Sequence, residues 1–344
     1  MYPENLIIVW LSLIHMNPEK TPFSFLLLAS LFVVLACGEV QTGREIKMGH
    51  ALVTSHPVHK AMVFLAERVE EKSNGQLRIK VYPNQQLGTE RELLELLQIG
   101  SLGMTKVSAA ALEGFAPTMQ VFGMPYLFRD DAHQKKVLDG PIGRQLLLDP
   151  EEFWLRGLCY YDGGKRSFYT KDKPIESPED LQGLKVRVME SNMASNMVRS
   201  MGGSPTPVAY GELYSALQQG IVDAAENNPP SLFTSKHYEV CKFYSIDEHT
   251  VLPDVVLIST KVWNLLSEEE KTWVQEAADE SSEYQYKIWA ESTEESLREL
   301  EKAGVQISYP DKALFREGVS EMYEQMEAEQ PEIYQLIKAI QLVN

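Results

Sequence analysis

The segment 184–228 reads LKVRVMESNMASNMVRSMGGSPTPVAYGELYSALQQGIVDAAENN. Apolar residues that recur with a period of two predict short strands at 184–188, 206–208 and 221–225. Between them, apolar residues at helical spacing predict helices over 194–201 and 211–219. Strands that alternate with helices at this spacing are typical of βαβ units, and so the segment predicts an α/β fold.

The same alternation continues outward from this segment. Upstream, the patterns predict strands at 46–49, 77–81 and 104–108, and helices at 57–73 and 89–100. Thr89-Glu90-Arg91-Glu92 has the form of a capping box at a helix start. Ser177-Pro178-Glu179-Asp180 predicts the start of another helix, with Pro at its first position.

A long helix is predicted late in the chain. Ser267-Glu268-Glu269-Glu270 is a capping box, and neither Gly nor Pro follows until Gly304. A helix over 267–303 would extend about 55 Å, which exceeds the diameter of a small domain. Its apolar residues drift around the axis without a strict heptad, which argues against a coiled coil. We therefore expect one helix that lies across two domains; the alternative is two helices with a bend.

Composition excludes several classes of partner. The 344 residues hold 32 Lys and Arg against 49 Asp and Glu, a formal net charge of −17. Such acidity argues against nucleic acid and against an anionic membrane surface, although one buried Arg can still bind a small anion. Three Cys are too few for a disulfide scaffold. Cys159 and Cys241 lie in apolar contexts typical of buried thiols, and a disulfide between them stays open.

Residues 1–36 are predicted to be a signal peptide. The run FSFLLLASLFVVLA, residues 23–36, has the length of a signal core rather than of a transmembrane helix. Ala36-Cys37-Gly38 resembles a bacterial lipoprotein processing box, which implies lipidation of Cys37. The alternative is ordinary cleavage after Ala36, and either Met1 or Met16 could be the start. We expect a periplasmic protein, anchored through Cys37 if it is lipidated.

The sequence contains no motif for catalysis or metal binding. It lacks HExxH, GxSxG and GxGxxG. The segment 163–167, GGKRS, fails as a phosphate loop because Arg166 stands where Ser or Thr should hold the metal. His56 and His59 have no third ligand in view. We therefore expect no catalytic residues, no metal and no cofactor.

Several segments carry a family resemblance. They are LKVRV at 184–188, GSPTP at 203–207, ELYSALQQG at 212–220 and VDAAEN at 222–227, with Tyr82-Pro83 and Gln86-Leu87-Gly88 upstream. In this order they closely resemble the DctP-type solute-binding proteins of tripartite ATP-independent periplasmic (TRAP) transporters. The resemblance covers essentially the whole chain after the signal peptide, including the long helix.

The resemblance implies a periplasmic-binding-protein-like α/β fold. Two α/β domains would surround a ligand cleft, with the long helix spanning both. Domain I would comprise 44–163 plus about 252–290, and domain II 164–251 plus about 291–344. The protein would be a monomer and not an enzyme, and it would deliver a small organic anion to the TRAP permease subunits in the membrane.

Two arginines are candidate carboxylate ligands. Arg187 alternates with Val186 and Val188 on a predicted strand, so it points away from its apolar neighbours. Strand ends in open α/β sheets are where ligands bind, and a guanidinium matches a carboxylate with two parallel hydrogen bonds. Arg166 matches a second family Arg; its alternative is a hinge or surface role.

Further site residues are carried over from the family. Asn227 matches the cleft Asn, Tyr210 a ring that lines the cleft, and Glu190 a polar position after the strand. Asn228 either binds ligand or caps the chain. The first domain would contribute Glu90, Ser108, His56 and His50; a helix-dipole role for Glu90 and a packed or surface role for each His are the alternatives.

The expected ligand is a hexuronate or related sugar acid. Carboxylates such as Glu90 and Glu190 repel a second ligand carboxylate but accept hydrogen bonds from sugar hydroxyls. The blocks SHPVHK at 55–60, MTKVS at 104–108, ENNPPS at 226–231 and KHYEV at 236–240 resemble the sugar-acid branch of the family. The alternatives are a C4-dicarboxylate or other carboxylate binder, a sensory binding protein, and a sugar-acid enzyme.

Overall fold

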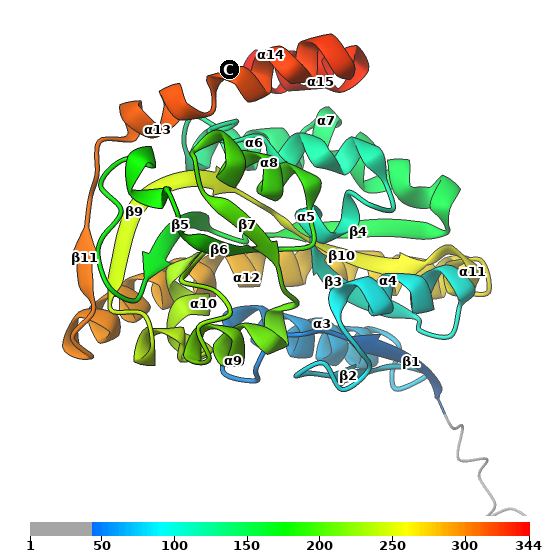
Figure 1. The fold of residues 1–344 in the computed structure, drawn as a ribbon. Coiled ribbons are helices and arrows are strands. Elements are labelled where there is room, and N and C mark those ends of the chain that lie inside the picture. The colour runs from blue at the N-terminus through cyan, green and yellow to red at the C-terminus, as the bar shows by residue number, and fades with distance from the viewer. Residues whose placement is uncertain (1–42) are drawn as a thin grey trace, which may run out of the picture. The chain divides into compact units, whose positions relative to one another are not determined.

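A computed structural model describes one unit of the chain, residues 43–344 (Figure 1). The predicted signal peptide and Cys37 lie outside the described residues. The unit contains two mixed β-sheets with helices against them, which confirms the α/β prediction.

The first sheet has five strands in the order β2-β1-β3-β10-β4. These are β1 (Arg44–Gly49), β2 (Leu77–Tyr82), β3 (Met104–Ser108), β4 (Leu155–Tyr161) and β10 (Asp254–Ser259). β1 runs parallel to β2 and β3, whereas β10 is antiparallel to β3 and β4. Helices α3 (Pro57–Lys72) and α4 (Glu90–Ile99) connect the parallel strands. The capping box predicted at Thr89 and Glu92 is present and begins α4.

The second sheet has six strands in the order β11-β9-β5-β8-β6-β7. These are β5 (Lys165–Thr170), β6 (Lys185–Val188), β7 (Ser204–Pro207), β8 (Ala224–Asn227), β9 (Phe243–Val251) and β11 (Gln306–Ser308). β6 is parallel to β7 and β8, through α8 (Asn192–Ser200), η4 (Tyr210–Glu212) and α9 (Leu213–Gln218). This confirms the βαβ pattern of the segment 184–228.

The chain passes between the sheets at three places. β4 leads into β5 through residues 162–164, and β9 leads into β10 through 252–253. The third connection is α12 (Glu268–Lys302), a single helix of 35 residues that begins with the predicted capping box at Ser267. Val274 packs in the core of the first sheet and Leu300 in that of the second, so α12 contacts both. The alternative of two helices is wrong.

Polar side chains of α12 cover the free edge of β4. Gln275 donates to the carbonyl of Leu158 at 2.9 Å, and Ser282 donates to that of Tyr160 at 2.6 Å. Gln285 accepts from the backbone N–H of Asp162 at 2.8 Å and donates to its carbonyl at 2.9 Å. Unpaired strand edges are otherwise sites of aggregation, so these bonds both close the edge and hold the connection into β5.

The remaining helices complete the unit. They are α5 (Ala109–Leu112), η1 (Pro117–Gly123), α6 (Asp131–Asp139), α7 (Pro141–Leu148), η2 (Asp149–Phe153), η3 (Pro178–Leu181), α10 (Pro229–Thr234), η5 (His237–Glu239), α11 (Thr260–Trp263), α13 (Lys312–Gly318), α14 (Ser320–Glu329) and α15 (Pro331–Gln341). No helix within residues 43–344 is long and apolar enough to cross a membrane. Cys159 and Cys241 are both buried and free.

Two local predictions need correction. The helix expected from Ser177 is only the short 3₁₀ helix η3, because Gly183 adopts a left-handed φ of 77° just before β6. The strand predicted at 221–225 lies three residues later, since Gly220 has a φ of 73° and Ile221 is still in the turn, 51% exposed. The shift places Asn227 inside β8.

Candidate ligand-binding site

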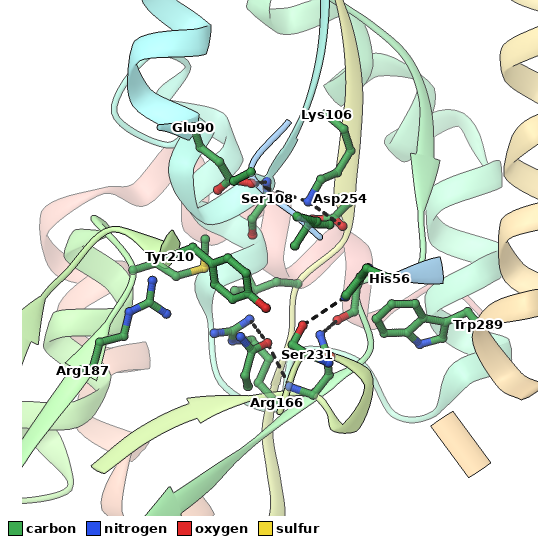
Figure 2. Close-up of a pocket in the computed structure, with 17 residues that line it drawn as sticks. His56, Glu90, Lys106, Ser108, Arg166, Arg187, Tyr210, Ser231, Asp254 and Trp289 are labelled. Carbon is green, nitrogen blue, oxygen red and sulfur yellow. Dashed lines mark hydrogen bonds and ion pairs between the residues drawn. The ribbon is translucent and has the colours of Figure 1, made fainter. Parts of the chain in front are cut away.

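A cavity lies between the two sheets and takes side chains from both (Figure 2). It is lined by Ala51, Leu52, His56, Glu90, Lys106, Ser108, Gly163, Arg166, Arg187, Met189, Tyr210, Asn227, Asn228, Ser231, Leu252, Asp254 and Trp289. The set includes every predicted ligand residue except Glu190 and His50. The connections 162–164 and 252–253 also border it, so the cavity lies where the sheets are joined.

Arg187 is the cation of the cavity that forms no ion pair within the part of the chain that the structure describes. It lies on β6, is only 2% exposed, and donates through Nε to the carbonyl of Val208 at 2.9 Å. Its Nη1 is buried without a hydrogen-bond partner among the described residues. Burial lowers the pKa of the guanidinium. A buried unpaired charge is costly, and a bound carboxylate would compensate it with two parallel hydrogen bonds.

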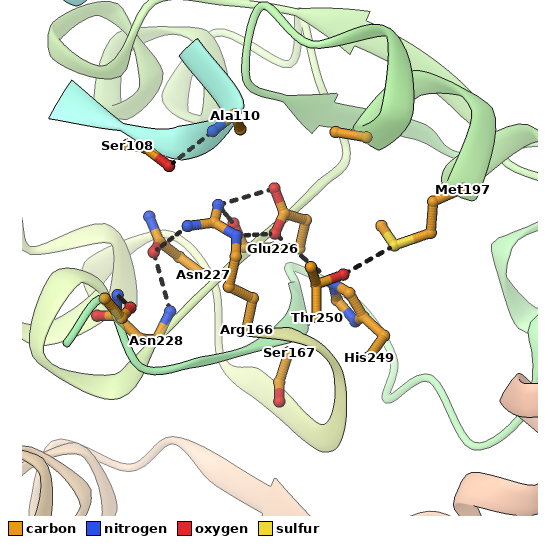
Figure 3. A network of polar contacts seen from close by, with 12 residues as sticks. Ser108, Ala110, Arg166, Ser167, Met197, Glu226, Asn227, Asn228, His249 and Thr250 are labelled. Carbon is orange, nitrogen blue, oxygen red and sulfur yellow. Dashed lines mark hydrogen bonds and ion pairs between the residues drawn. The ribbon is translucent and has the colours of Figure 1, made fainter. Parts of the chain in front are cut away.

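Arg166, on β5, is already neutralised. Its guanidinium binds both carboxylate oxygens of Glu226, with Nη2 to Oε1 at 2.8 Å, and Nη1 donates to Oδ1 of Asn227 at 2.9 Å (Figure 3). It lines the cavity, as the family resemblance implies. However, its ion pair with Glu226 makes it a rigid hydrogen-bond donor rather than a second free clamp.

The pair continues into a buried charge network. His249 donates through Nδ1 to Oδ2 of Asp247 at 2.7 Å. Its Nε2 lies 3.6 Å from Oε2 of Glu226, beside Arg166 (Figure 3). Although burial opposes the charged imidazole, Asp247 and Glu226 raise the pKa of His249 to about 9. Burial would likewise raise the pKa of Glu226, but Arg166 and His249 lower it to about 2. The network therefore holds Arg166 and Glu226 charged.

The two neighbouring asparagines have different roles. Asn227 accepts at Oδ1 from Arg166 and from the N–H of Asn228, both at 2.9 Å, so its amide NH₂ is the end left for a ligand. Asn228 accepts from the N–H of Ser231 at 2.8 Å and donates to the carbonyl of Gly163 at 2.7 Å. Because both ends of its amide are occupied, Asn228 caps α10, as the alternative interpretation had it.

The first sheet contributes a second cluster of charges, around Lys106. Nζ of Lys106 lies 2.9 Å from Oδ2 of Asp254 and 3.5 Å from Oε1 of Glu90. Oε1 of Glu90 also accepts from the N–H of Ser108 at 3.2 Å. Ser108 itself caps α5 through its hydroxyl, which accepts from the N–H of Ala110 at 3.4 Å.

Lys106 and Asp254 were missed by the sequence argument. Lys106 lies between Thr105 and Val107 on β3, which is a weaker signal than the two valines that flank Arg187 on β6. Asp254 follows directly on the connection from β9. Burial would lower the pKa of Lys106, but Asp254 and Glu90 outweigh it and raise that pKa.

The histidines divide between cavity and scaffold. His56 caps α3, because its Nδ1 accepts from the N–H of Val58; the opposite nitrogen, Nε2, lies 3.3 Å from Oγ of Ser231 across the cavity. Its ring packs at 5.8 Å from that of Trp289 on α12. His50 lies outside the cavity lining, because its Nδ1 accepts from Leu52 and its Nε2 lies 2.9 Å from Nδ1 of His59. His50 is therefore buried and packed against His59, away from the cavity.

Of two other predicted ligand residues, Tyr210 lines the cavity and Glu190 does not. Glu190 is exposed and lines a neighbouring cavity rather than this one, although Arg187 and Tyr210 border both. Tyr210 lies at the cavity, and its hydroxyl is 2.6 Å from Oγ of Ser235. Within residues 43–344, no group of three or more His, Cys, Asp or Glu could hold a metal ion.

Together, two mixed sheets joined by short connections, with a cavity between them whose Arg187 has no ion pair among the described residues, are typical of a solute-binding protein. The model of the DctP family, described as bacterial extracellular solute-binding protein, family 7, matches residues 48–330. The chain therefore belongs to this family of TRAP periplasmic solute-binding proteins, which confirms the resemblance and makes the enzyme alternative wrong.

Known relatives are similar over most of the chain. A solute-binding protein of Chromohalobacter salexigens is 35% identical over 288 residues, which cover 83% of this chain and 86% of the relative. A solved structure with bound β-D-galacturonate is also similar: the TRAP periplasmic solute-binding protein from Sulfitobacter sp. NAS-14.1. It has a TM-score of 0.85 and 34% sequence identity, and the match covers 87% of this chain and 99% of that one. The crystal structure of one from Chromohalobacter salexigens with bound D-glucuronate has a TM-score of 0.84 and 34% sequence identity. The match covers 86% of this chain and 99% of that one.

Proposed function

We propose that this protein captures a hexuronate or closely related sugar acid in the cavity and delivers it to a TRAP permease. The observation that carries the proposal is Arg187, whose buried Nη1 has no hydrogen-bond partner in residues 43–344 while polar side chains line the cavity around it. A ligand carboxylate would complete this guanidinium. Structures at about one third identity that hold glucuronate or galacturonate support the sugar acid.

The polar groups around Arg187 suit a ring that carries hydroxyls. The amide NH₂ of Asn227 and the hydroxyl of Tyr210 can donate, whereas the carboxylates of Glu90 and Asp254 can accept. Trp289 and Leu252 offer apolar surface to the carbon face of a sugar. The hydroxyls of a hexuronate would thus find donors and acceptors among these side chains, as buried polar groups require.

Capture would proceed by closure of two domains. We propose domain I as 44–163 plus about 252–290 and domain II as 164–251 plus about 291–344, in line with the sheet to which each strand belongs. The short connections at 162–164 and 252–253 would be hinges, which are commonly a few residues at the ends of elements.

Calorimetry on the chain from residue 38 onward tests the function. We expect D-galacturonate or D-glucuronate to bind with micromolar or lower Kd, and galactose, which lacks the carboxylate, to bind at least about 100-fold more weakly. Tight binding of succinate or malate without binding of any sugar acid would instead indicate the C4-dicarboxylate alternative.

We also propose a periplasmic location with a lipid anchor on Cys37. The support is the sequence Ala36-Cys37-Gly38 after an apolar run. In a Gram-negative host, the full chain should fractionate with membranes and carry acyl mass on Cys37, and Cys37→Ala should release it. A wild-type protein that is soluble and begins at Cys37 would contradict the anchor.

A further inference from the structure

We propose that the cluster of Lys106, Asp254 and Glu90 acts as a charge filter, which admits acids with one carboxylate and rejects acids that carry a second carboxylate at the far end. The inference rests on the proposed function, because it concerns the same cavity and narrows its ligand class.

The cluster carries one positive and two negative groups in a nearly closed environment. Lys106 is 3% exposed, and its ammonium is shared between Asp254 at 2.9 Å and Glu90 at 3.5 Å. The two carboxylates therefore leave a surplus of negative charge at this side of the cavity. The remaining lone pairs of these carboxylates can accept hydrogen bonds from hydroxyl groups of a ligand.

The opposite side of the cavity carries a surplus of positive charge. Arg187 forms no ion pair among the described residues, whereas Arg166 is paired with Glu226. Figure 2 shows Lys106, Asp254 and Glu90 on one side of the cavity and the two arginines on the other. Among residues 43–344, the cavity thus has one cation without an ion pair on the second sheet and an anionic surplus on the first sheet.

This polarity sets the orientation of a ligand and limits its charge. One carboxylate binds Arg187, and the far end of the same molecule then reaches the Lys106 cluster. A hydroxyl there donates to Asp254 or Glu90. A second carboxylate cannot donate, and it brings like charges together beside the buried Asp254 and Glu90, where such juxtaposition weakens binding.

Lys106 does not offset this repulsion, because its ammonium is already engaged. A second ligand carboxylate would have to displace Asp254 or Glu90 from it, and the displaced carboxylate would remain buried without a partner. Only removal of one protein carboxylate would free the ammonium for a ligand anion.

Three acids with the same carbon skeleton test the filter. Galacturonate reports whether the site binds sugar acids at all. Galactonate and galactarate are both open-chain acids that differ only at one end, where galactonate has a CH₂OH group and galactarate a second carboxylate. In calorimetry at pH 7.5, we expect wild-type protein to bind galactonate at least about 100-fold more tightly than galactarate.

Substitution of the filter should change this ratio. Asp254→Asn and Glu90→Gln keep the shape and remove one negative charge, so each should raise the affinity for galactarate relative to galactonate by about tenfold or more. Glu327→Gln, on an exposed position of α14, makes the same change in net charge and should leave the ratio unaltered. Thermal unfolding of each variant verifies that it is folded.

The outcomes separate the filter from the proposed function. Binding of galacturonate together with equal binding of galactonate and galactarate would overturn the filter and leave the function standing. If neither open-chain acid binds the wild type, new binding of galactarate alone by either variant supports the filter, and no gain in either overturns it. Failure of every sugar acid, with tight binding of succinate, would overturn both.

Discussion

Arg187 is a buried charge without an ion pair among residues 43–344, and this has two opposite consequences. Arg187→Ala should weaken sugar-acid binding by about 30-fold to several thousand-fold, because removing one partner of a buried charged pair costs roughly 2–5 kcal/mol. The ligand-free protein should lose no stability from the lost charge, since the free guanidinium lacks its counter-ion. Calorimetry and urea unfolding of the same variant measure the two effects.

Matched substitutions separate charge from shape at this position. Arg187→Lys should restore little affinity, because an ammonium cannot reproduce the planar fork. Arg199→Ala, on the exposed face of α8, removes the same side chain away from the cavity and should bind like the wild type. Near-native affinity in Arg187→Ala would show that the residue is structural and would contradict its role as the carboxylate ligand.

His249 makes stability depend on pH in a definite direction. Its pKa is about 9 in the folded protein, above the ordinary value of 6.5, so the folded state binds its proton more tightly than the unfolded state. The stabilisation is full below pH 6.5 and is lost as the pH rises through 9. The free energy of unfolding should therefore fall between pH 6.5 and 9.5 in the wild type, measured by urea titration.

The control for this pH effect is His249→Gln, which cannot carry the charge. It should be less stable than the wild type at pH 6.5, and the difference should shrink toward pH 9.5. A difference that stays constant over this range would mean that His249 contributes through packing against Phe168 rather than through charge.

At the scale of the element, α12 works as much through its polar side chains as through its apolar ones. Gln285 is completely buried, and both ends of its amide bond the backbone of Asp162. Gln285→Met keeps the volume but leaves two partly buried backbone groups of Asp162 without their partner, so it should lower the free energy of unfolding by about 1–3 kcal/mol. Denaturant titration measures this loss.

Gln275→Met is the matched control on the same helix. Gln275 also bonds the edge of β4, but its position is partly exposed, so water can replace the lost bond at the carbonyl of Leu158. We expect a loss below about 1 kcal/mol for this variant. Equal losses in the two variants would show that burial of the edge does not set the cost.

Local patterns predicted most elements but not all their bounds. The capping boxes at Thr89 and Ser267 correctly marked the starts of α4 and α12. The capping box at Ser177 and Asp180 also forms, yet only a short 3₁₀ helix follows, because a nearby Gly ends it. A helix start is encoded in three or four residues, whereas its length depends on what the next residues pack against.

At the scale of the whole molecule, ligand binding should bring the two sheets together. Small-angle scattering should show a smaller radius of gyration with saturating galacturonate than without it, because a ligand held from both sheets favours the closed form. Arg187→Ala, at the same ligand concentration, should scatter like the ligand-free wild type. An unchanged profile in the wild type at saturation would contradict closure.

The sequence by itself determined the α/β class, the long helix and the family, and it singled out Arg187 as a candidate, because periodicity, caps and motifs are properties of neighbouring residues. Only the tertiary structure decided the partners of the buried charges. Glu226 neutralises Arg166, and Asp254 pairs with Lys106, although about 60 and 150 residues separate the members of these pairs. Sheet register brings such groups together, and a one-residue slip would turn each of them to the other face. Which arginine is free to bind an anion therefore followed from the fold and from no local pattern.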